Sequence, residues 1–209
     1  MDICVIGDSI TYGEGDIDQG GWAHRLRLSI EQSIAREGII PTIYNLGVLG
    51  DTTEDCLRRI ECELSAREPS LVLLAIGIND SAYRENKSDN IIPLSRFSEN
   101  IEKLIGISRE FTENIGFIGL TRVNEALVKP LPRSTKRKSF ANDVIETYDN
   151  KIKEICSAEG VPYIEMTNAL ADEDLTDGLH PNTNGYKKMF DRIHPVVERM
   201  IKEQEVMYE

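Results

Sequence analysis

Residues 2–9 read DICVIGDS, a short apolar run that ends in a glycine, an aspartate and a serine. A run of this length that is rich in β-branched residues is typical of a buried strand in a parallel sheet. The polar triplet after it places the hydroxyl of Ser9 at a strand-to-loop corner. A serine at such a corner is a candidate nucleophile when a base lies near it in the fold.

The same alternation of apolar runs and amphipathic segments continues along the chain. Four more strands are predicted, at residues 42–46, 70–77, 115–120 and 161–165. Helices are predicted at residues 20–36, 52–67, 94–111, 140–158 and 182–203, and irregular structure at 81–93 and 122–139. Because parallel strands need long crossovers, the pattern predicts a three-layer α/β/α fold. Its five-stranded parallel sheet is expected to have the flavodoxin-like order 2-1-3-4-5.

The bulk composition is that of an ordinary globular protein with an acidic surface. The 209 residues are predicted to form one domain, 1–209, with 40% hydrophobic and 29% charged residues and a net charge of −12. That charge predicts no nucleic-acid partner and no anionic membrane partner. The composition does not indicate an oligomeric state.

Cysteine usage and the start of the chain bear on the compartment. The four cysteines are scattered without a CxxC pair, which predicts buried, reduced thiols. The chain opens directly into a strand, without the charged and apolar regions of a secretion signal. No apolar stretch approaches the roughly 20 residues of a membrane span. These features together predict a cytoplasmic protein.

Four polar segments follow predicted strands and define a candidate site. They are GDS at residues 7–9, GVLGD at 47–51, GIND at 77–80 and DGLHP at 177–181. In open parallel sheets, ligands bind outside the carboxyl ends of the strands. The four segments are therefore expected to converge at one edge of the sheet, although they are far apart in the sequence.

Each segment offers a group that ester hydrolysis needs. His180 is the natural base for the hydroxyl of Ser9, and Asp177 can orient its imidazole and stabilise the imidazolium. Attack on an ester creates an oxyanion, which preorganised donors must stabilise. The backbone N–H groups of Ser9 and Gly50 and the side-chain amide of Asn79 can supply three such donors.

Taken together, the four segments resemble the sequence blocks of the SGNH hydrolases, also called the GDSL lipase/esterase family. The resemblance extends from Ile3 to about Tyr186. It implies a Ser-His-Asp triad of Ser9, His180 and Asp177, an oxyanion hole of Ser9, Gly50 and Asn79, and a reaction that requires neither cofactor nor metal.

Two positions depart from the family pattern, and one placement has an alternative. Ile10 stands where the family name has leucine, which is an apolar exchange. Ile78 stands where some members have glycine, which narrows the pocket but keeps the amide of Asn79. Gly47 is the alternative to Gly50 as the donor from the second block.

Other polar and aromatic residues have structural interpretations. Asp8 is expected to bind backbone N–H groups at the corner, and Asp80 to hold its loop in place rather than to bind a metal. His24 and His194 are expected to be helix-surface or packing residues, and Trp22 a core residue. Only Tyr12 is a candidate to line the substrate site, because it follows Ser9 closely in the sequence.

The irregular stretch 122–139 is basic, and two interpretations of it stay open. It contains Lys129, Arg133, Lys136, Arg137 and Lys138, with no acid among them. A solvated loop is the simpler interpretation. The alternative is a lid or a cationic patch at the active-site edge, because the stretch follows the fourth strand.

The leading hypothesis is a serine esterase that cleaves small, soluble carboxylic esters or thioesters through an acyl-enzyme. One alternative is a metal-dependent phosphoesterase, whose ligands would be Asp8, Asp51, Asn79, Asp80 and His180. The chain has only three histidines, whereas two-metal sites usually use several. The other alternative is a non-catalytic binding module, although no phosphate-binding glycine motif follows any strand.

Overall fold

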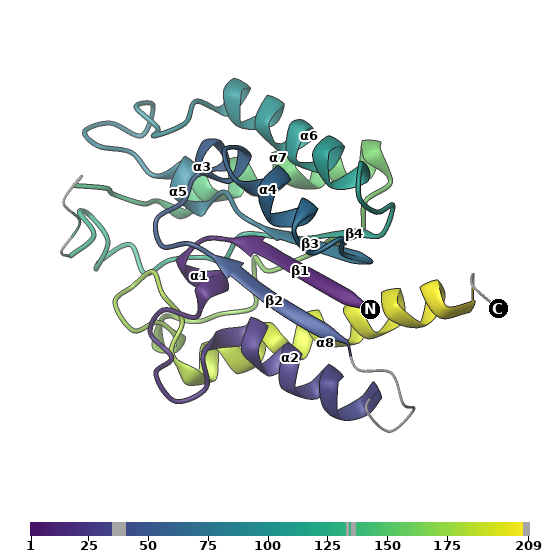
Figure 1. The fold of residues 1–209 in the computed structure, drawn as a ribbon. Coiled ribbons are helices and arrows are strands. Elements are labelled where there is room, and N and C mark those ends of the chain that lie inside the picture. The colour runs from purple at the N-terminus through teal and green to yellow at the C-terminus, as the bar shows by residue number, and fades with distance from the viewer. Residues whose placement is uncertain (35–40, 133, 135–136, 207–209) are drawn as a thin grey trace.

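The computed structural model describes residues 1–34, 41–132, 134 and 137–206 of the chain. Its centre is a parallel sheet with the strand order β2-β1-β3-β4-β5, as predicted (Figure 1). The strands are β1 (Asp2–Gly7), β2 (Thr42–Gly47), β3 (Leu71–Ala75), β4 (Ile115–Ile118) and β5 (Tyr163–Ile164). The predicted three-layer α/β/α fold is confirmed.

Strand register brings the ends of the first three strands level. Gly7, the last residue of β1, pairs with Gly47 of β2 and with Ala75 of β3. Ile3 and Val5 in β1 have no exposed surface, because β1 lies inside the sheet and helices cover both faces. The loops that follow these three strands therefore start side by side at one edge of the sheet.

Helices cover the sheet on both faces (Figure 1). One layer holds α2 (Gly21–Ile34) and α8 (Thr183–Val206), which pack against each other. Trp22 of α2 is fully buried, as predicted for a core residue. The other layer holds α3 (Thr53–Leu57), α4 (Ile60–Ser65), α6 (Leu94–Arg109) and α7 (Asn142–Glu159).

Three short elements at the sheet edge were not predicted. They are α1 (Ser9–Tyr12), α5 (Ile78–Ser81) and the 3₁₀ helix η2 (Asp172–Asp174). Ser9 therefore begins a single helical turn rather than a loop. Each element is too short for helical periodicity to show in the sequence. All three are nevertheless close to the segments that carry the candidate site residues.

One predicted helix, residues 52–67, is instead two helices that break at Arg58 and Arg59. The backbone N–H of Arg59 bonds the carbonyl of Cys56, three residues back, in place of an α-helical bond. The break turns the Arg59 side chain toward the sheet edge, where Nε donates to Asp51 at 2.8 Å and Nη2 donates to the carbonyl of Gly7 at 3.1 Å. These tertiary contacts outweigh local helix propensity.

Both predicted irregular stretches lack regular elements over most of their described length, and they pair with each other. Tyr83 and Ser139 exchange two backbone hydrogen bonds in an isolated antiparallel bridge. Residue 133 and residues 135–136 lie outside the described residues, as do 35–36 of the first predicted helix. The bridge joins the loop after β3 to the basic loop after β4.

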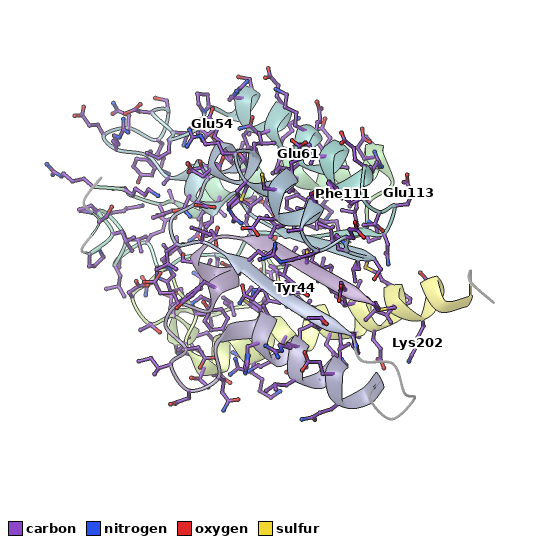
Figure 2. The ribbon with its side chains drawn as sticks, viewed as in Figure 1. Tyr44, Glu54, Glu61, Phe111, Glu113 and Lys202 are labelled. Carbon is purple, nitrogen blue, oxygen red and sulfur yellow. The ribbon has the colours of Figure 1, made fainter. Side chains whose placement is uncertain are left out.

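Surface features complete the fold. Tyr44, which Figure 2 labels, lies on the edge strand β2, and the guanidinium of Arg67 lies 5.1 Å from the centroid of its ring.

Cys62 on α4 is exposed, so the prediction of four buried thiols is wrong at this position, whereas the other three cysteines are buried. Within the described ranges, every helix falls short of the length or apolar character that a membrane span requires.

Candidate active site

A tight corner presents Ser9 at the end of β1. Asp8 caps α1, and its Oδ1 accepts the backbone N–H of Ile10 at 2.9 Å, the structural role expected of it. A Cβ at Gly7 would lie 2.5 Å from the carbonyl oxygen of Ala75, so only glycine fits there. Ser9, which follows this corner, is 4% exposed.

The segment after β5 brings an imidazole to this serine. Nε2 of His180 lies 2.9 Å from Oγ of Ser9, and Nδ1 lies 2.8 Å from Oδ2 of Asp177. Gly178 has φ +91°, the left-handed conformation that lets the chain turn between the acid and the base. Ser9, Asp177 and His180 therefore meet as a continuous hydrogen-bonded chain, although 171 positions separate the serine from the histidine.

The carboxylate determines which ring nitrogen carries the proton. Burial alone would raise the pKa of Asp177, but hydrogen bonds from the ring and backbone of His180 outweigh it and hold the pKa at about 2. An ionised carboxylate only accepts hydrogen bonds, so Nδ1 is protonated. Nε2 of the neutral imidazole then accepts the Ser9 hydroxyl, the arrangement in which it can remove that proton.

A fourth residue at the site, Glu14, was not predicted to act there. Its Oε2 lies 3.3 Å from Nε2 of His180, and its side chain is 42% exposed. The neighbouring glycines allow this approach, since Gly15 has φ +93° and packs against the carbonyl of Pro181. The sequence signal was an acid between two glycines at residues 13–15.

Glu14 affects the titration of the candidate base. Burial lowers the pKa of His180, whereas its bond to Asp177 and the charges of Asp177, Glu14 and Asp8 raise it, and the net shift is upward. We expect Glu14→Gln to lower the pKa of His180, because it removes a negative charge that stabilises the imidazolium. An NMR titration of the three histidines measures this directly. Glu31→Gln, which neutralises an acid paired with Arg27 on α2, is the control. An unchanged or higher pKa in Glu14→Gln would contradict the assignment.

The predicted oxyanion donors lie beside the corner. Asn79 is 5% exposed, and its Nδ2 donates to the carbonyl of Asp51 at 3.1 Å. Gly50 immediately precedes Asp51 in a turn with φ +80°, a conformation that requires glycine. A Cβ at Gly47 would lie 2.3 Å from the backbone nitrogen of Tyr12, whereas one at Gly50 would have no atom within 4 Å. Gly47 thus packs under α1, while Gly50 keeps an open face.

The family model for GDSL-like lipases and acylhydrolases matches residues 5–188. The chain belongs to this family. It is similar to the isoamyl acetate-hydrolyzing esterase of Saccharomyces cerevisiae, with 25% identity over 93% of this chain and 84% of the relative. It is also similar to the esterase TesA of Pseudomonas aeruginosa, with 21% identity over 95% of this chain and 89% of that one.

Solved structures agree with the assignment to the GDSL family. The crystal structure of a lipase/acylhydrolase from Enterococcus faecalis has a TM-score of 0.72 and 27% identity, and covers 94% of both chains. The acetylxylan esterase Axe2 of Geobacillus stearothermophilus has a TM-score of 0.70 and 20% identity, over 92% of this chain and 91% of that one. The structural likeness confirms the predicted fold, and the family match with the esterase relatives shows that this member of the GDSL family is an ester-bond hydrolase.

Two further acids of this GDSL hydrolase, Asp80 and Asp51, hold loops in place. Asp80 accepts the backbone N–H of Thr53 at 3.1 Å, and Asp51 accepts Nε of Arg59 at 2.8 Å. Burial raises the pKa of Asp80 to about 7 and that of Asp8 to about 6. Among the described residues, no three histidine, cysteine or acidic side chains gather as a metal site would require.

Tyr12 lies on the same short helix as Ser9, whereas His24 and His194 lie on the helices α2 and α8. Tyr12 is 56% exposed on α1, three residues after Ser9, and its substrate-lining role stays a prediction. His24 is exposed on α2. Nε2 of His194 lies 2.9 Å from Oγ of Ser29, between α8 and α2. Both histidines thus have the surface or packing positions expected of them.

Proposed function

We propose that this GDSL-family hydrolase is a serine esterase in which Ser9 is the nucleophile. The observation that carries the proposal is the chain of two hydrogen bonds, 2.9 Å from Ser9 to His180 and 2.8 Å from His180 to Asp177. A serine hydroxyl is a weak nucleophile until a base removes its proton, and this chain supplies the base and orients it.

The reaction proceeds in two halves. His180 Nε2 takes the proton from Ser9 as Oγ bonds to the ester carbonyl carbon, and a tetrahedral oxyanion forms. The carbonyl re-forms as the bond to the leaving oxygen, or to sulfur in a thioester, breaks, and the leaving group takes the proton from His180. Water repeats the sequence on the acyl-enzyme and releases the acid.

The oxyanion is stabilised by groups at three strand ends. Donors are the backbone N–H of Ser9, the backbone N–H of Gly50 and Nδ2 of Asn79. Removing one such donor typically costs about 3 kcal/mol of transition-state stabilisation. No cofactor takes part in any step, because every proton transfer uses a side chain or water.

The substrate is a small ester with a short acyl group. Ser9 is 4% exposed and His180 8% exposed, and this limited access to the reacting residues favours a short acyl group such as acetyl over a long chain. The names of the yeast relative, which hydrolyses isoamyl acetate, and of Axe2, an acetylxylan esterase, support the same class. The four unpaired cysteines support a cytoplasmic site of action.

Two measurements test the proposal. A fluorophosphonate probe is expected to label the peptide that contains Ser9. The serine of a non-catalytic binding module would not react with the probe. Hydrolysis of p-nitrophenyl esters is expected to fall steadily from acetate to palmitate and to be unaffected by EDTA. Labelling at a different serine would remove Ser9 from the role, and loss of activity with EDTA would favour a metal-dependent phosphoesterase. A preference for palmitate would reject the short-acyl assignment alone.

A further inference from the structure

Lys138, in the basic loop after β4, lies behind the amide of Asn79 and has no part in the reaction as described so far. Its Nζ donates to Oδ1 of Asn79 at 2.8 Å. Lys138 is 8% exposed and Asn79 is 5% exposed. An ammonium is costly to bury unless it is well paired, so the bond to Asn79 holds this buried cation in a specific position.

The backbone around Lys138 is held on both sides. Its carbonyl accepts the N–H of Leu131 at 2.8 Å, and its own N–H donates to Oγ of Ser134 at 3.1 Å. The next residue, Ser139, exchanges two backbone hydrogen bonds with Tyr83, at 2.9 and 2.8 Å. Tyr83 follows α5 by two residues, so the loop that carries the ammonium is anchored beside the element that carries the amide.

This contact determines which way the Asn79 amide faces. An amide has an acceptor end and a donor end, whereas an ammonium can only donate. Oδ1 must therefore face Lys138, and Nδ2 must face the opposite side, where one N–H donates to the carbonyl of Asp51 at 3.1 Å. The second N–H of Nδ2 can donate to the oxyanion. In these buried surroundings the cation also draws electron density toward Oδ1, which makes Nδ2 a stronger donor.

We propose that Lys138 is a positioning residue for the oxyanion hole, acting through Asn79; this rests on the proposed serine-esterase function. Lys138 neither touches the substrate nor forms part of a lid. Its side chain orients and polarises the Asn79 amide, so that Nδ2 donates more strongly to the negative oxygen of the tetrahedral intermediate. Of the two interpretations of the basic stretch, Lys138 therefore departs from the solvated loop: its cation is buried at the active-site edge.

The first test is Lys138→Met, which keeps an unbranched side chain, one atom shorter, and removes the charge. We expect kcat for p-nitrophenyl acetate to fall by roughly tenfold to hundredfold, with KM within about threefold, because the interaction strengthens only in the transition state. Lys129→Met is the matched control, since Lys129 lies in the same loop, pairs with Glu125 and is more than a third exposed. A rise in KM at constant kcat would overturn the proposal in favour of substrate binding.

The decisive test is a double-mutant cycle with Asn79→Ala. If Lys138 acts through Asn79, Lys138→Met should lower kcat by less than about threefold once the amide is gone. An equal loss of kcat in both backgrounds would overturn the proposal. So would an unchanged kcat when Lys138→Met is made in the protein that keeps Asn79. Should Lys138→Met fail to fold, Lys138→Arg carries the test, and a tenfold or greater loss of kcat that persists in the Asn79→Ala background overturns it. None of these outcomes changes whether Ser9 is labelled, so the two proposals fail separately.

Discussion

Replacing Ser9 with alanine is expected to lower kcat for p-nitrophenyl acetate by at least about 10⁴-fold, since no other group can form the acyl-enzyme. The change removes one oxygen, which bonds Nε2 of His180 at 2.9 Å. His180 keeps its bond to Asp177, so the imidazole stays in place. The lost hydrogen bond costs only about 1 kcal/mol of folding stability. Thermal unfolding should therefore change little while turnover and fluorophosphonate labelling disappear.

The chain supplies a matched control for that experiment. Ser29 also contacts a histidine, with its Oγ 2.9 Å from Nε2 of His194. This pair lies between α2 and α8, and His194 packs against the ring of Phe190 with centroids 5.0 Å apart. Ser29→Ala removes the same kind of hydrogen bond and should leave kcat unchanged. If Ser9→Ala kept activity within tenfold of the wild type, the serine-esterase mechanism would be wrong.

The sequence identified the residues whose positions follow from strand ends. Apolar runs predict where β1 and β3 lie, and parallel pairing then aligns Gly7 with Gly47 and Ala75. Segments after those positions must share one edge of the sheet. Asp177 and His180 could be predicted for a different reason, because both belong to one short turn and their contact is local in the sequence.

Residues that reach the site from irregular loops could not be predicted in the same way. Lys138 bonds Asn79 across 59 positions of sequence, and an isolated bridge between Tyr83 and Ser139 makes that contact possible. Such a bridge has no periodicity, so it leaves no pattern in the sequence. Glu14 stood out only as an acid between glycines. Its position beside His180 depends on the path of a loop.

Asp177→Asn is expected to lower kcat by about 10⁴-fold, through the tautomer of His180. Oδ1 of Asp177 accepts two backbone N–H groups, from Leu179 at 3.0 Å and from His180 at 2.8 Å. In the variant these donors retain the amide oxygen at that position. The amide NH₂ must then replace Oδ2, which lies 2.8 Å from Nδ1 of His180. An NH₂ group donates to Nδ1, so the proton moves to Nε2, and the imidazole cannot accept the proton of Ser9.

The pH profile separates this tautomer effect from a loss of fold. The charge of Asp177 helps to raise the pKa of His180, so the neutral amide should lower that pKa and move the acid limb of kcat/KM to lower pH. The plateau should fall at the same time. Asp191→Asn, at an exposed acid paired with Lys187 on α8, should change neither feature. A plateau within tenfold of the wild type would mean that Asp177 does not orient the base, because the backbone donors leave the amide no other way to face.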